Sequence, residues 1–175
     1  MAPILGPHTD MSDSAFVDAY QSTAQDFPRP VAVVGCRRGN AQHAITVDSF
    51  LDVSYDPPTM AVSVYGGSRM AESLELTDSC TLSVLSAEQK GIAQWLGEPA
   101  QPLHGILDSI DTVDAPSGGP IIAGCVAWFD LRIVQRVAAA THDLLIGRVE
   151  ACSTEGTPPP PLVHWAGRYH RPAPR

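Results

Sequence analysis

Near the start of the chain, apolar and small side chains recur at intervals of three and four residues from Phe16 to Phe27. Such spacing puts them on one face of a helix and therefore predicts an amphipathic helix. Ser12 or Asp13 can cap its first turn, and Pro28 ends it because proline disfavours a helical conformation in the preceding residue. Residues 1–11 lack periodicity and are expected to form a loose leader.

Further along, short runs rich in Val, Ile and Leu, bounded by Gly, Asn, Asp and Pro, predict β-strands. These runs cover residues 31–36, 44–47, 59–64, 80–85, 125–134, 142–152 and 162–170. Two short helices are predicted between them, at 69–76 and from Ser86 towards Leu96, where Ser86 and Gln89 have capping-box spacing. Many short strands with few helices indicate a mainly β, antiparallel barrel with peripheral helices.

The composition indicates one folded domain rather than two. With 175 residues, 44% of them hydrophobic and 17% charged, the chain is apolar enough to bury a core and too poor in charge for a disordered protein. Its 14 glycines and 16 prolines argue against a bundle of long helices. We expect a single domain over residues 12–170, followed by a loose tail at 171–175.

The charge pattern excludes some classes of partner. The net charge is −8 and the arginines are scattered, whereas nucleic-acid binding needs clustered positive charge. No window approaches the roughly 18 apolar residues that span a bilayer, and the N-terminus lacks the basic start and apolar segment of a signal peptide. We therefore expect a cytoplasmic protein that binds neither nucleic acid nor membrane.

Familiar metal and nucleotide motifs are missing from the sequence. Cys36, Cys80, Cys125 and Cys152 lie far apart, so no C-x-x-C pair exists to start a zinc or redox site, and no metal is expected. Each lies in an apolar run, and all four are expected to be buried, inert thiols. Since G-x-G-x-x-G and G-x-x-x-x-G-K are also absent, any nucleotide must bind outside the Rossmann and P-loop frameworks.

The segment 43–58 places polar side chains among apolar residues and ends in Asp-Pro-Pro, which predicts a sharp turn before the next strand. Two interpretations are open. In one, the hydroxyls satisfy backbone groups of a strand-turn-strand unit. In the other, Thr46, Asp48, Ser49 and Ser54, together with exposed amides, form a polar cradle for the dipolar edge of a planar ligand and its phosphate.

Five collinear motifs resemble those of the flavin reductase-like family. They are FPRPVAVVG from residue 27, TVDSFLDVSYDPPTMAVSV from 46, LSVLSAEQ from 82, HDLLIGRV from 142 and PLVHWAGRY from 161. The resemblance extends over about residues 13–170, and the motifs are specific in combination. It implies the FMN-binding split-barrel fold, an antiparallel β-barrel of Greek-key type with peripheral α-helices.

The resemblance also implies an activity. Members of the family are NAD(P)H:flavin oxidoreductases that act as homodimers and bind FMN or FAD in a groove near the subunit interface. NADH or NADPH donates the hydride, and the reduced flavin often leaves for a partner monooxygenase. The same activity and partner are expected for this chain.

Eight residues match positions that contact the flavin in the family. The ring and ribityl contacts fall on Thr46, Val47, Asp48 and Ser49, the phosphate contacts on Ser63, Ser68 and Arg69, and Ser83 lies on a strand that faces the flavin. The resemblance thus implies that the flavin site combines the 46–49 segment with residues from three later parts of the chain.

His142 matches the histidine of the family's Gly-Asp-His motif, which lies beside the nicotinamide, and is the candidate catalytic residue. Its alternative role is to cap a turn between two strands. The chain departs from the family where Ala140 and Thr141 replace Gly-Asp and where Asp48 replaces the usual Asn. These departures leave a second function open: a non-catalytic split-barrel protein that binds flavin or haem, or a non-catalytic partner of an oxygenase.

Overall fold

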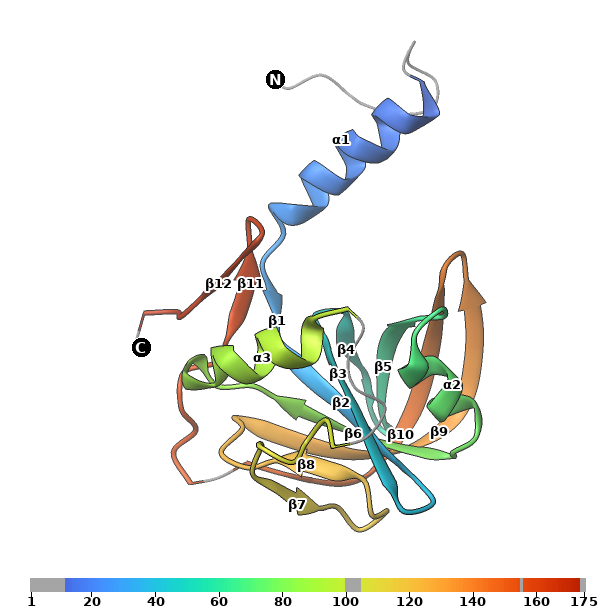
Figure 1. Cartoon of the computed structure of the whole chain (residues 1–175), viewed down its shortest axis with the longest axis vertical. Coiled ribbons are helices and arrows are strands. Elements are labelled where there is room, and N and C mark those ends of the chain that lie inside the picture. The colour runs from blue at the N-terminus through green and yellow to red at the C-terminus, as the bar shows by residue number, and fades with distance from the viewer. Residues whose placement is uncertain (1–11, 100–104, 155, 174–175) are drawn as a thin grey trace.

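The computed structural model describes residues 12–99, 105–154 and 156–173. Its largest layer contains β2 (Ala32–Arg38), β3 (Ala41–Val47), β4 (Phe50–Tyr55), β5 (Pro58–Tyr65), β6 (Ser79–Val84), β9 (Ala127–Ala139) and β10 (His142–Ser153). They form one antiparallel sheet in the order β3-β2-β6-β9-β10-β5-β4 (Figure 1). The sheet is strongly curved but not closed, since β3 and β4 are its two edges, and this agrees with the predicted split barrel.

Two smaller sheets and three helices complete the described structure. One sheet has the order β1-β11-β12 and the other pairs β7 with β8. Their bounds are β1 (Arg29–Pro30), β7 (Thr112–Asp114), β8 (Pro120–Ile122), β11 (Val163–Trp165) and β12 (Arg168–His170). The α-helices are α1 (Asp13–Gln25), α2 (Arg69–Glu75) and α3 (Lys90–Gly97), the last preceded by a 3-10 turn at Ala87–Gln89. Among the described residues, no helix has the length and apolar character needed to cross a membrane.

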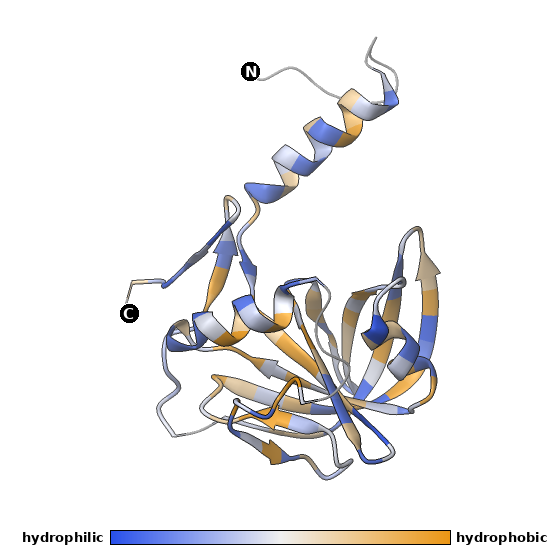
Figure 2. Cartoon of the chain, in the orientation of Figure 1, coloured by the Kyte–Doolittle hydropathy of each residue, from blue (hydrophilic) through white to orange (hydrophobic). Residues whose placement is uncertain are grey.

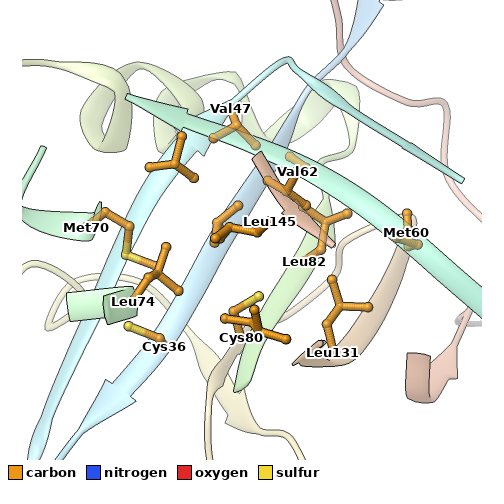
Figure 3. Close-up of a cluster of buried hydrophobic side chains, with 14 of the residues drawn as sticks. Cys36, Val47, Met60, Val62, Met70, Leu74, Cys80, Leu82, Leu131 and Leu145 are labelled. Carbon is orange, nitrogen blue, oxygen red and sulfur yellow. The ribbon is translucent and has the colours of Figure 1, made fainter. Parts of the chain in front are cut away.

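The main core lies inside the curved sheet and under α2. Leu74 from α2 packs there with Val62 and Leu82 from the sheet, and all three are at most 1% exposed (Figure 3). A second cluster joins β2 to α3 through Val33, Ala93 and other apolar residues. Because α2 and α3 are both held by buried side chains, the polar residues at their ends have fixed positions relative to the sheet.

The helix predicted near the start of the chain is confirmed, and Ser12 caps it by accepting a hydrogen bond from the Ala15 N–H at 3.3 Å. It ends at Gln25, just before the predicted stop at Pro28. Hydrophobic and hydrophilic residues alternate along it (Figure 2), but none of them is buried. The helix projects away from the sheets (Figure 1).

Of two further local predictions, the capping box is confirmed and the last strand is wrong. The capping box at Ser86 and Gln89 is confirmed. The single strand predicted at 162–170 is wrong, because β11 and β12 form a hairpin around Ala166 and Gly167, which have φ values of 49° and 70°. Two successive residues with positive φ make the tight turn that antiparallel strands favour.

The prediction of four buried cysteines is confirmed for three of them and wrong for Cys152, which is exposed near the end of β10. Its neighbours alternate between the two faces of that strand, so an apolar run did not imply burial. Burial raises the pKa of Cys36 to about 11 and that of Cys80 to about 12. These two thiols are therefore protonated and unreactive at neutral pH.

Candidate functional site

A cavity of about 630 Å³ opens between β3, α2 and α3. Ser68 and Arg69 line it from the start of α2, and Ile45 and Leu96 line it from β3 and α3. Arg38 and His43 also contribute side chains to its wall. The cavity thus combines apolar walls with cations, hydroxyl groups and the carboxylates of Glu72 and Glu98, and apolar walls with a few polar groups are typical of small-molecule sites.

The position of Ser68 and Arg69 follows from how α2 is held at both ends. Ser68 is the N-cap, and its hydroxyl accepts a hydrogen bond from the Ala71 N–H at 3.1 Å. At the other end, Arg136 of β9 donates to the backbone oxygens of Leu74 and Thr77 at 2.9 and 2.6 Å. These contacts satisfy backbone groups that a short helix leaves unpaired, and so fix the helix beside the cavity.

His142 lies beside the cavity at the turn between β9 and β10. Its Nδ1 is 3.0 Å from the Thr141 hydroxyl, and its ring meets that of Tyr65 edge-on at 5.6 Å between centroids. Tyr65 lines the cavity, and the Gly66 N–H donates to the Thr141 oxygen at 3.0 Å. The loop that leads into α2 is therefore docked on the turn that bears His142.

The backbone of this turn has an unusual conformation at Ala140, where the resemblance implies a glycine. Ala140 has a φ of 55°, a left-handed conformation that glycine adopts without strain and alanine does not. The family's glycine at this position therefore fits the same turn, and alanine keeps its shape at an energetic cost.

The segment Thr46–Ser49 forms the end of β3 and the connection to β4. The Thr46 hydroxyl donates to the Ala93 oxygen of α3 at 2.9 Å, and Val47 packs its side chain into the main core. The Ser49 oxygen accepts from the Ser63 N–H at 2.9 Å. The Thr46–Ser49 segment is thus tied to α3, to the core and to β5, and Ser63 of that strand, predicted as a phosphate contact, does not line the cavity with Ser68 and Arg69.

Asp48 is held by two partners from distant parts of the chain, the Arg29 guanidinium and the His164 imidazole. Its Oδ2 lies 3.2 Å from Arg29 Nη1 and 3.0 Å from His164 Nδ1, and the Ser49 hydroxyl donates to its Oδ1 at 3.2 Å. Burial by itself raises the pKa of Asp48, but the contacts with His164 and Arg29 outweigh it and leave that pKa below its usual value of 3.8. Asp48 is therefore a carboxylate at neutral pH, and its charge is balanced.

Most of the chain, including the residues of this site, matches a known protein family. The model of the family described as "Flavin reductase like domain" matches residues 24–173, which include every residue placed above. The chain belongs to the flavin reductase-like family. The predicted fold and the predicted class of enzyme, a flavin reductase, are thereby confirmed.

Individual members of the family agree over most of the chain. The NADH-dependent flavin reductase StyB of Pseudomonas fluorescens is 33% identical over 146 residues, which cover 82% of this chain and 83% of StyB. The NADH:FAD oxidoreductase SgcE6 of Streptomyces globisporus has a similar structure, with a TM-score of 0.85 at 26% identity over 99% of each chain. The styrene monooxygenase flavin reductase of Pseudomonas putida S12 has a TM-score of 0.79 at 31% identity, over 89% of this chain and 99% of its own.

The donor groups of this flavin reductase-like chain suit a flavin nucleotide. Arg69 and Ser68 at the cavity provide a cation and a hydroxyl group for a phosphate. The cavity has room for a nucleotide-sized ligand, and Ile45 in its wall directly precedes the Thr46–Ser49 segment, whose own residues do not line the cavity. Of the predicted flavin contacts, Ser68 and Arg69 are thus the two that line the cavity and would hold a phosphate of FMN or FAD there.

Ser83 lies apart from this group. Its side chain is fully buried, and its hydroxyl accepts a hydrogen bond from the Ile122 N–H of β8 at 3.1 Å. That bond ties the small β7-β8 sheet to β6, so the hydroxyl is engaged inside the protein. We do not include Ser83 in the proposed site.

Sequence reasoning missed the partners of Asp48 and two residues of the cavity wall. His164 is 116 positions from Asp48, so no local spacing could pair them. Arg29 lies within the family motif FPRPVAVVG, which drew attention to its segment but not to its side chain. Arg38 and His43 share the β2-β3 hairpin, and only the cavity reveals that both face a common space.

Proposed function

We propose that this flavin reductase transfers hydride from NADH or NADPH to FMN or FAD held along the cavity, with the flavin phosphate at Ser68 and Arg69. The observation that supports this arrangement is the contact between Tyr65, which lines the cavity, and His142 beside it. It brings the proposed phosphate end and the proposed nicotinamide end of the site onto one continuous surface. A bound flavin supplies the hydride acceptor, which no amino-acid side chain provides.

The residues of the chain bind and orient the reactants. Thr46, Asp48 and Ser49 hold the flavin ring and ribityl chain through the backbone of their segment, and Ser63 supports that segment through its bond to Ser49. His142 orients the nicotinamide carboxamide without exchanging a proton, since hydride transfer depends on holding the two rings close together. The relative SgcE6 has been solved in complex with NAD and FAD fragments, which supports a shared site for both.

The test of this function is reduction of added flavin by NADH or NADPH under exclusion of air, followed as stopped-flow bleaching of the visible flavin band. His142→Ala should raise the KM for the nicotinamide and lower kcat, together by about 10- to 100-fold in kcat/KM, and leave flavin affinity nearly unchanged. Arg171→Ala is the control, because it removes only an exposed ion pair with Glu88.

Absence of bleaching with both nicotinamides and with FMN, FAD and riboflavin would refute the reductase. The protein would then be a flavin- or haem-binding member of the fold or a non-catalytic oxygenase partner, and the replacement of Gly-Asp by Ala140-Thr141 would be the first cause to examine. Wild-type activity that His142→Ala leaves intact would instead refute only the role of His142.

We further propose that the reduced flavin serves a separate monooxygenase. Support comes from the relative named as the flavin reductase of a styrene monooxygenase, which is 31% identical to this chain. A cytoplasmic location is part of the same proposal, since NADH and NADPH are supplied there.

A homodimer completes the proposal. The edge strand β4 exposes Leu51, Val53 and Tyr55, with 55%, 52% and 86% of each residue accessible. An exposed, apolar sheet edge is a surface that proteins normally cover, and a second copy of the chain covers it symmetrically. Helix α1, which has no buried residue, adds Val17 and Tyr20 to the apolar surface available to a partner copy.

A further inference from the structure

Three segments far apart in the sequence meet at the carboxylate of Asp48. Arg29 comes from β1, Asp48 from the connection after β3, and His164 from β11. All three side chains are partly buried, with exposures of 27%, 26% and 32%. Their contacts are therefore shielded from solvent more than those of an ordinary surface ion pair.

The protonation of this group follows from its geometry. An ionised carboxylate has no hydrogen to donate, so the His164 Nδ1 at 3.0 Å must carry the shared hydrogen. Tyr169 of β12 packs its ring 5.4 Å from that of His164, and its pKa is raised by burial and then by the charge of Asp48. Arg29, His164, Tyr169 and the Ser49 hydroxyl are the titratable and polar groups that face this carboxylate from the four segments around it.

The C-terminal hairpin that supplies His164 is anchored independently of Asp48. Trp165 Nε1 donates to the Asp26 oxygen at 3.0 Å, and the Ala166 N–H donates to the Gln25 oxygen at 2.9 Å. Arg29 is anchored in turn through its Nη2, which donates to the Ala24 oxygen at 2.8 Å. Both partners of Asp48 are thus held in place from outside the segment that contains it.

This arrangement matters because of the charge that a flavin acquires. A reduced flavin gains electron density and becomes anionic, so an uncompensated carboxylate in the segment that holds it would oppose reduction. The resemblance to the family implies a neutral Asn at the position of Asp48, and the structure places Arg29 and His164 on the Asp48 carboxylate. The extra negative charge thus meets the Arg29 cation and a hydrogen bond from His164, both from elsewhere in the fold.

We propose that His164 and Arg29 are positioning residues of the flavin site: His164 holds Asp48 by a hydrogen bond and Arg29 by an ion pair, so that the Thr46–Ser49 segment accepts reduced as well as oxidised flavin. This inference rests on the proposed function. It assigns a role in flavin binding to the C-terminal hairpin, which lines none of the described cavity.

The experiment compares the affinities of the full-length protein for oxidised and reduced FMN and FAD, measured by anaerobic titration. His164→Ala should lower the affinity for oxidised flavin by about tenfold, because Asp48 loses a charge-assisted hydrogen bond. It should lower the affinity for reduced flavin by at least about a further threefold. His164→Asn should restore most of the oxidised affinity, since its amide N–H can replace the Nδ1 donor. His170→Ala is the matched control in the same hairpin, and should change both affinities less than twofold.

Equal weakening of both flavin forms by His164→Ala would indicate a general loss of hairpin packing and overturn the proposal, as would unchanged affinity in a folded variant. Should His164→Ala fail to fold, Arg29→Gln provides the same comparison of the two flavin forms from the other partner. Failure of the wild type to bind any flavin would refute the proposed function itself. This outcome differs from a failure of the present proposal because it is seen with the wild type alone, without any variant.

Discussion

At the scale of single residues, the charge of Asp48 links stability to pH. Its pKa is lowered in the folded protein, so the ionised form contributes stability above the usual value of 3.8, and this contribution is lost as pH falls through the lowered value. Asp48→Asn retains the shape and removes the charge. We expect it to reduce the free energy of unfolding by about 1–3 kcal/mol at pH 7 and by progressively less below about pH 4.

Urea unfolding at pH 7 and at steps down to pH 3 measures this difference. Asp18→Asn is the control, since Asp18 is exposed on α1 and its replacement should change stability by less than about 0.5 kcal/mol. If the difference in free energy of unfolding between wild type and Asp48→Asn is the same at pH 3 as at pH 7, the charge of Asp48 is not the source of that difference.

At the scale of an element, α2 depends on its partners. A helix of seven residues is unstable alone, and this one relies on its buried face and on Arg136, which binds two backbone oxygens at its C-terminal end. We expect Arg136→Ala to lower the free energy of unfolding by about 1–2 kcal/mol and to weaken flavin binding, because Ser68 and Arg69 begin the same helix.

Thermal unfolding and flavin titration test both parts of this prediction. Arg132→Ala on the same strand is the matched control, since Arg132 makes an exposed ion pair with Glu150 that contributes about 0–1 kcal/mol. If the two variants behave alike, the contacts at the end of α2 do not stabilise it.

At the scale of the whole molecule, the exposed edge of the seven-stranded sheet predicts assembly. Val53→Asp should convert the proposed dimer to a monomer at micromolar concentration, because it buries a charge in the apolar contact. Val113→Asp is the control, because Val113 is similarly exposed, at 55% against 52%, but lies on the separate β7-β8 sheet. Light scattering distinguishes the outcomes, and a wild-type monomer would refute the dimer.

Local sequence patterns were enough to predict the types of most elements and the family. Ser12 caps α1 and Ser86 forms a capping box with Gln89, because capping depends on residues within one turn of each other. Alternating and apolar runs located most strands of the large sheet for the same local reason. The five motifs pointed to the flavin reductase-like family, and hence to candidate residues such as Ser68 and His142, without any knowledge of contacts.

Which of these residues lie together became clear only from how the segments pack in three dimensions. It joined Asp48 to His164 across 116 positions, and it engaged the Ser83 hydroxyl with the backbone of β8. It also exposed Cys152 at the end of a run whose composition predicted burial. The physical reason is common to all three: hydrogen bonding and burial depend on which segments pack together, and long-range strand pairing, rather than local spacing, sets that packing.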